Sequence, residues 1–113
     1  MLPKKHRLTR AEVEHLVRHG AAYHSPHLTL RALPREDSNY HFGFAASRKV
    51  SLLAVVRNRL RRQGYFAVES FLRARPLSLN GIFYFKRGSS ELSRVEVERE
   101  VHTLLLRCRI GRI

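Results

Sequence analysis

Apolar residues recur at helical spacing close to the start of the chain. Thr9 and Glu12 are spaced as a capping box, and apolar residues then follow on one helical face until Gly20. Glycine suits the position just after the last helical turn. The pattern therefore predicts a short first helix that ends at Gly20.

The next two segments alternate between apolar and polar residues. Residues 27–33 (HLTLRAL) alternate, residues 34–39 (PREDSN) have the composition of a turn, and residues 40–46 alternate again. This arrangement predicts an antiparallel hairpin. The three aromatic residues of its second strand share one face, which suits either a core or a groove in which unpaired RNA bases stack.

A basic helix follows the predicted hairpin. It is expected to begin between residues 47 and 53 and to continue past Gly64. Glycine inside a helix costs about 1 kcal/mol relative to alanine, so the helix could kink at Gly64, end early or simply tolerate the glycine. Residues 75–81 read as a loop and residues 82–87 as a strand rich in β-formers. Ser93 and Glu96 then form a second capping box, which predicts a closing helix of three or four turns.

The predicted order of elements is α-β-β-α-β-α, which indicates an α+β fold. With 113 residues the chain suits one domain, a two-layer sandwich of a small mixed sheet packed with helices. Residues 1–7 are expected to form a flexible basic arm ahead of it. If the strands that flank the basic helix are parallel, the default handedness of their crossover is right-handed.

Positive charge dominates the composition. The chain has 22 Lys and Arg against 9 Asp and Glu, and residues 47–62 hold six of the cations without an acid. A folded domain this basic is expected to bind nucleic acid through phosphates, although an ordinary solvated helix face and a membrane surface are the alternatives. The candidate RNA-binding residues are Arg48, Lys49, Arg57, Asn58, Arg59, Arg61 and Arg62.

The sequence argues against a catalytic centre within the protein. One Asp and eight Glu supply few carboxylates for a two-metal nuclease, so neither a catalytic residue nor a metal site is predicted. His15 and His19 are one helical turn apart but lack a third ligand at a suitable spacing. The single cysteine, Cys108, excludes an intrachain disulfide and reads as a packing residue in a reducing, cytoplasmic protein.

The basic segment resembles a known family signature. Residues 47–50 (SRKV) and 54–62 (AVVRNRLRR) look like the signature of the bacterial ribonuclease P protein component, and residues 2–20 and 91–107 resemble that family's start and closing helix. The resemblance implies a subunit that binds a catalytic RNA, with one protein for each RNA. That RNA, with its own Mg²⁺, hydrolyses the bond that releases the 5′ leader from precursor tRNA.

The resemblance also implies a left-handed crossover and a cleft for the leader between the first helix and the sheet. Its expected lining residues are Arg7, Val13, Val17, Arg31, Phe42 and Phe44. Val13 and Val17 depart from the aromatics that relatives carry, and Arg31 departs from a common tyrosine. The alternative function is a structural RNA-binding protein such as a small ribosomal protein.

Overall fold

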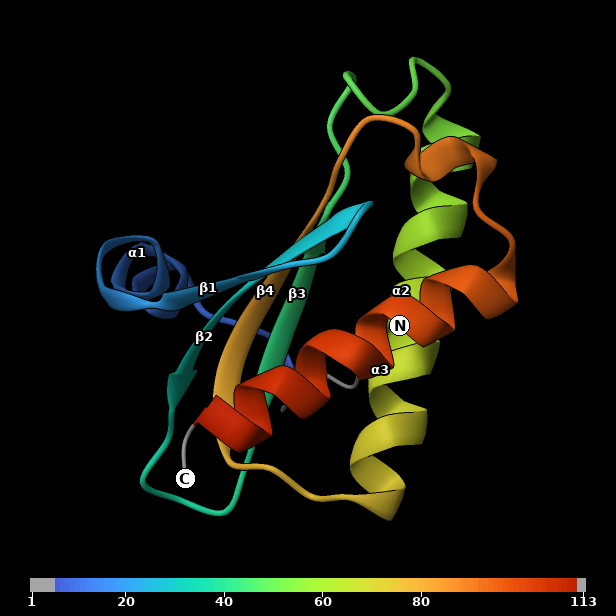
Figure 1. Ribbon diagram of the computed structural model, residues 1–113. Coiled ribbons are helices and arrows are strands. Elements are labelled where there is room, and N and C mark those ends of the chain that lie inside the picture. Colours follow the sequence, from blue (N-terminus) through green and yellow to red (C-terminus); the bar gives the residue numbers. More distant parts are fainter. Residues whose placement is uncertain (1–5, 112–113) are drawn as a thin grey trace.

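The computed structural model describes residues 6–111, which form a four-stranded sheet with helices on both faces (Figure 1). The elements are α1 (Arg10–His19), β1 (Ala21–His24), β2 (Leu28–Pro34), β3 (His41–Ala45), α2 (Ala54–Ala74), β4 (Leu79–Phe85), the short 3₁₀ helix η2 (Ser89–Glu91) and α3 (Arg94–Gly111). Helices α2 and α3 cover one face of the sheet and make the two-layer sandwich with it, whereas α1 lies against the other face. The predicted α+β class is confirmed.

The predicted hairpin between the second and third strands is wrong. The strand order is β1-β2-β4-β3, so β4 lies between β2 and β3 and pairs antiparallel with β2 and parallel with β3. Alternation identified both strands, but it does not specify which strand pairs with which. Strand β1 was not predicted, because its four residues do not alternate between apolar and polar. Most of them are exposed.

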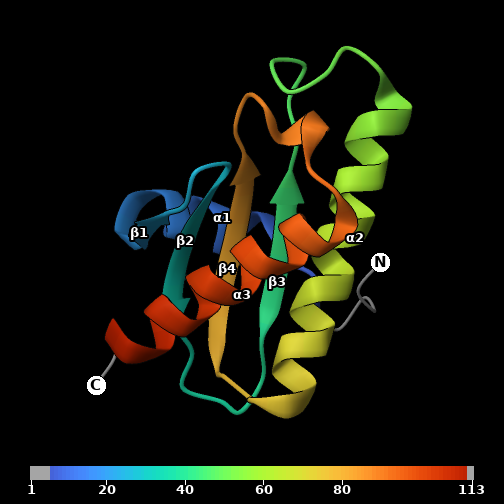
Figure 2. The same cartoon turned by 45° about the vertical axis from the view of Figure 1, so that its right-hand side comes forward.

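The connection from β3 through α2 to β4 is left-handed. Figure 2 shows β3 and β4 pointing the same way, with α2 and α3 on the near face and β4 to the left of β3. A right-handed crossover would place β4 on the right in this view. The handedness implied by the family resemblance is therefore correct, and the general default does not apply here.

Helix α2 continues through Gly64 without a break. A Cβ atom added there would lie 2.3 Å from Cε1 of Phe44 on β3, so the absence of a side chain lets the ring approach the helix closely. The Phe44 ring stacks on Phe83 of β4 with centroids 4.7 Å apart and planes 6° apart. Gly64 is thus a packing residue at the contact of α2 with the sheet.

Several predicted boundaries shift. Helix α2 begins at Ala54, so Arg48 and Lys49 precede it in a turn. Strand β4 begins at Leu79, inside the segment that was predicted as a loop, and ends at Phe85. Both capping boxes are present at the predicted positions, since Thr9 pairs with Glu12 and Ser93 pairs with Glu96.

The expected basic arm lies only partly within the described residues, because positions 1–5 are outside them. The two remaining residues lie along β3. The His6 ring stacks on Tyr40 at 4.1 Å, with its Nδ1 3.0 Å from the Tyr40 carbonyl oxygen, and Arg7 forms a parallel bridge with Phe42. His6 and Arg7 are therefore part of the folded edge of the sheet.

Candidate nucleic-acid interface

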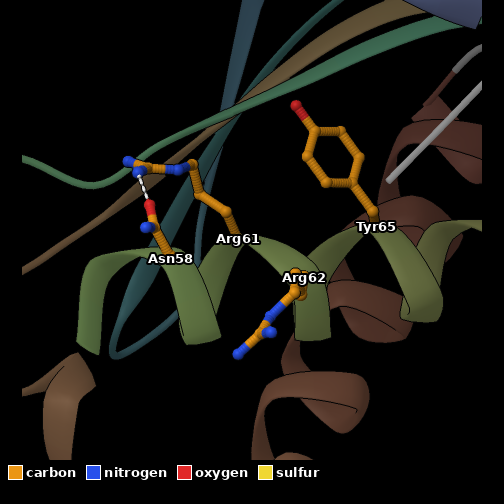
Figure 3. A pocket seen from close by; sticks show the side chains of 4 residues that line it. All are labelled: Asn58, Arg61, Arg62 and Tyr65. Carbon is orange, nitrogen blue, oxygen red and sulfur yellow. Dashed lines mark hydrogen bonds between the residues drawn. The ribbon is translucent and has the colours of Figure 1, made fainter. Parts of the chain in front are cut away.

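The first half of α2 presents polar side chains beside β3. Leu60 and Gly64 are buried, and the helical period places Asn58, Arg61 and Tyr65 together on the flank of α2 that adjoins β3. Arg61 donates to the Asn58 side-chain oxygen and lies 3.5 Å from the Ala46 carbonyl oxygen. With Arg62, these three residues line an open pocket of about 420 Å³ (Figure 3).

The remaining arginines of the motif take different positions. Arg57 donates to the Ser51 carbonyl oxygen at 2.8 Å and so fixes the turn that leads into the helix. Arg62 is exposed, and Figure 3 shows it directed away from Asn58, Arg61 and Tyr65. Cationic groups consequently extend along both flanks of α2.

Arg59 has a structural contact that the sequence did not indicate. Its side chain is half-buried, and Nη2 donates to the Ser90 carbonyl oxygen of η2 at 3.0 Å. Its Nε is buried and has no hydrogen-bond partner within residues 6–108. Arg59 therefore connects α2 to η2 as well as contributing charge, so it is a poor choice for a substitution that is meant to leave the fold intact.

Arg48 and Lys49 are exposed in the turn before α2. The turn is closed by the Val50 amide, which donates to the Ser47 carbonyl oxygen at 3.0 Å, and the Val50 side chain is buried. The buried valine anchors the turn against the core. The two cations consequently extend the charged surface from α2 toward the end of β3.

Within residues 6–108, the acids that form ion pairs do so away from the α2 motif. No ion pair in this part of the chain reaches Arg57, Arg59, Arg61 or Arg62; the five that it contains involve other cations. The motif therefore presents uncompensated positive charge, the condition that phosphate binding requires.

Glu12 is the centre of a polar network that joins α1 to the sheet. Its carboxylate accepts from the Thr9 amide at 2.8 Å and from Arg35 Nη1 at 2.7 Å, and it lies 2.9 Å from Nδ1 of His41. Burial raises the pKa of Glu12, but the contacts from Thr9, His41 and Arg35 outweigh it and lower the pKa to about 2. The network holds α1 over the beginnings of β3 and β4, where His41 and Asn80 lie.

Arg35 completes this network from the loop after β2. It makes two hydrogen bonds to Asp37, each 2.8 Å long, and donates to the Asn80 side-chain oxygen at 2.8 Å. The Arg35 guanidinium is the main cause that lowers the pKa of Asp37 to about 2. Sequence reasoning missed these partners, because they are distant along the chain and no local pattern marks them.

The expected leader-cleft residues divide between the two faces of the sheet. Val13 is half-buried and Val17 is 51% exposed on α1, and Arg31 is half-buried on the face of β2 that α1 overlies. Phe42 and Phe44 do not line a cleft: both are buried in the core on the α2 side, at 1% and 7% exposure. They correct the prediction that these aromatics face the groove.

The α1 side of the sheet instead carries the alternate residues. Gly43 and Ala45 of β3 face this side, and the register places Tyr84 of β4 next to Ala45 and opposite Thr29 of β2. Tyr84 is half-buried and is not among the expected lining residues of the cleft. Alternation along β4 indicates that Tyr84 lies on the face opposite the core, because Phe83 and Phe85 on either side of it belong to the core.

Other chemistry finds little support in residues 6–108. Within them no group of three or more His, Cys, Asp or Glu is positioned to hold a metal ion, and no helix is long and apolar enough to cross a bilayer. His15 and His19 lie close, with ring centroids 4.8 Å apart. Cys108 is buried, in agreement with a packing residue.

The comparisons with known proteins agree with each other. The family model of ribonuclease P matches residues 2–109. A ribonuclease P protein component from Microcystis aeruginosa is 35% identical over 114 residues, covering 96% of this chain and 95% of the relative. Another from Gluconacetobacter diazotrophicus is 43% identical over 84 residues, covering 73% of this chain and 70% of the relative.

Solved structures share the fold. The RNase P protein of Staphylococcus aureus superposes with a TM-score of 0.77 at 15% identity, covering 93% of this chain and 96% of that one. The RNase P protein of Thermotoga maritima superposes with a TM-score of 0.73 at 19% identity, covering 89% and 96%.

Proposed function

Because the chain belongs to the ribonuclease P protein family, we propose that its α2 surface holds the catalytic RNA of that ribonucleoprotein. The protein is a subunit of an endoribonuclease that processes tRNA precursors, and catalysis is by the RNA. The alternative of a small ribosomal protein is not favoured, since the curated relatives carry the name of the ribonuclease P component.

The catalytic RNA binds the cationic surface, defined by Arg48, Lys49, Arg57, Asn58, Arg61 and Arg62. The observation that carries this proposal is the lack of any acid paired with the motif's arginines within residues 6–108. Guanidinium groups match phosphate oxygens in pairs, and Asn58 adds a neutral donor and acceptor suited to a ribose or a base edge. Mg²⁺ is held by the RNA, and one protein binds each RNA in the cytoplasm.

The 5′ leader of precursor tRNA binds the opposite face, between α1 and the sheet. Val13, Val17 and Arg31 remain candidates there, and Tyr84 replaces Phe42 and Phe44 as the aromatic group on that side. Arg7 approaches from the segment that pairs with β3. An arginine at position 31 suits the leader's phosphates and can also stack on a base.

Reconstitution at low Mg²⁺ tests the assignment. Adding the protein to its cognate catalytic RNA should increase cleavage of precursor tRNA, because the protein's cations replace part of the metal ions needed to screen phosphates. Arg62→Ala should reduce this gain, whereas Arg73→Ala, an exposed arginine in the last turn of the same helix, serves as the matched control. No gain from the unaltered protein would overturn the proposal.

A further inference from the structure

An exposed aromatic ring lies on α2 one turn beyond Arg62. Phe66 is 55% exposed, although the core positions of this helix are filled by other residues. Positions 62 and 66 are four residues apart, so their side chains project from the same side of the helix, with Cα atoms about 6 Å apart along its axis. A single exposed apolar residue is ordinary on a protein surface, and the case for Phe66 depends on its neighbours.

Arg94 of α3 lies over the Phe66 ring. The guanidinium carbon is 5.9 Å from the ring centroid, within the range of a cation–π contact. Arg94 is exposed, and no ion pair engages it within residues 6–108. It is also the first residue of α3, where the helix dipole disfavours a cation. Helix stability therefore does not account for the arginine at this position.

Together Phe66 and Arg94 present two flat groups of the kind that hold an unpaired base. Nucleobases stack on aromatic rings and on guanidinium planes, and a neighbouring cation holds the adjoining phosphate. Arg62 supplies that cation on the same side of α2. The positive charges of Arg62 and Arg94 favour a polyanion as the partner. The site therefore continues the cationic surface from α2 onto α3.

We propose that Phe66 and Arg94 form a stacking site for an unpaired nucleobase of the catalytic RNA. This inference rests on the proposed function and extends the RNA contact across α2, beyond the pocket beside β3. Phe66 supplies the aromatic platform, Arg94 supplies the guanidinium plane, and Arg62 binds phosphate beside them.

Fluorescence gives a direct test, because the chain contains no tryptophan. In Phe66→Trp, stacking of a base on the indole should quench its emission when the cognate catalytic RNA is added. Ala74→Trp places the same reporter on an exposed position of α2 two turns further on and should respond less. Equal responses from the two reporters would overturn the proposal.

Affinity measurements separate stacking from charge. Phe66→Ala should weaken RNA binding about fivefold to 150-fold, the range expected for one stacked base. Val95→Ala removes a neighbouring side chain that is also 55% exposed, and should change affinity by less than about twofold. Arg94→Lys keeps the charge without the plane, so it should weaken binding as Arg94→Ala does. Full affinity in Arg94→Lys would overturn the stacking role.

The outcomes also distinguish this site from the proposed function. If Arg62→Ala weakens binding and Phe66→Ala does not, the cationic surface stands and the stacking site is wrong. If neither variant weakens binding, the placement of the catalytic RNA on α2 is wrong. Dissociation of a dimer by Phe66→Ala with unchanged RNA affinity would assign the ring to contact with a second copy of the chain and overturn the proposal.

Discussion

Replacing Gly64 by alanine should destabilise the fold, although alanine is the better helix former. The added Cβ would lie 2.3, 2.6 and 2.7 Å from three ring atoms of Phe44. Favourable contacts between carbon atoms are about 3.5–4.0 Å long, so the overlap exceeds roughly 1 Å. The ring has little room to retreat, because Phe83 stacks on it at 4.7 Å and Tyr65 meets it edge-on at 4.9 Å.

Two opposing contributions set the size of the effect. Alanine gains about 1 kcal/mol of helix propensity over glycine. Overpacking a close-packed core costs about 1–3 kcal/mol, and a clash with a ring confined in this way belongs at the upper end of that range. The net expectation for Gly64→Ala is a loss of about 2 kcal/mol in the free energy of unfolding.

Urea unfolding followed by far-ultraviolet circular dichroism measures this loss as a lower midpoint at an unchanged slope. Phe44→Ala provides the second arm of a double-mutant cycle, because without the ring Gly64→Ala should stabilise by about 1 kcal/mol. Phe44→Leu serves if the alanine variant does not fold. Gly43→Ala is a milder control, since its Cβ would meet the flexible end of Leu8 at 3.2 Å and Cγ1 of Ile82 at 3.9 Å, an ordinary contact. A neutral Gly64→Ala, or the same cost in both backgrounds, would refute the reasoning.

Three further predictions concern charge. Arg62→Ala should weaken RNA binding and change the free energy of unfolding by less than about 0.5 kcal/mol. Arg59→Ala should lower the free energy of unfolding by about 1–2 kcal/mol, because it loses the hydrogen bond to the Ser90 carbonyl oxygen. If roughly six phosphates are neutralised, RNA affinity should fall by about 10³ between about 50 and 200 mM salt, and a flat response would contradict that number. The pKa of Glu12 is lowered to about 2, so its carboxylate stabilises the fold above its ordinary pKa of 4.5, and this is lost as the pH falls from 4.5 through 2. Glu12→Gln should therefore lower the free energy of unfolding at neutral pH and reduce its loss between pH 4.5 and 2. If the variant loses as much stability over this range as the unaltered protein, Glu12 is not the cause of that loss.

Local signals were sufficient to predict the helices. The capping boxes at Thr9 and Ser93 depend on residues three positions apart, and both are present. The helical period also places Asn58 and Arg61 on the same flank of α2, where they lie beside Tyr65, whereas Arg62 is directed away from them. Predictions of this kind succeed because their cause lies within one or two turns of the chain.

Long-range pairing was beyond reach for the opposite reason. Strand β4 pairs with both β2 and β3, yet alternation along a strand identifies its two faces without identifying its neighbours or which face is covered. The alternation therefore left the core and a groove open for Phe42 and Phe44, and both lie in the core. The sequence left a break at Gly64 open, because the Phe44 ring, which requires a glycine at this position, is twenty residues away along the chain.

The placement of the few acids explains how a folded chain keeps its RNA-binding surface charged. Glu12 and Glu96 cap α1 and α3, where the helix dipole favours them, and Glu100 accepts from Ser25 and from the His27 amide. Burial raises the pKa of Glu100, but these hydrogen bonds outweigh it and lower that pKa. These three carboxylates are engaged by contacts away from the α2 motif, and none of them pairs with its arginines. These three acids thus fix α1, α3 and the loop before β2, and no ion pair within residues 6–108 takes up the positive charge of the α2 motif, which leaves it for the proposed RNA.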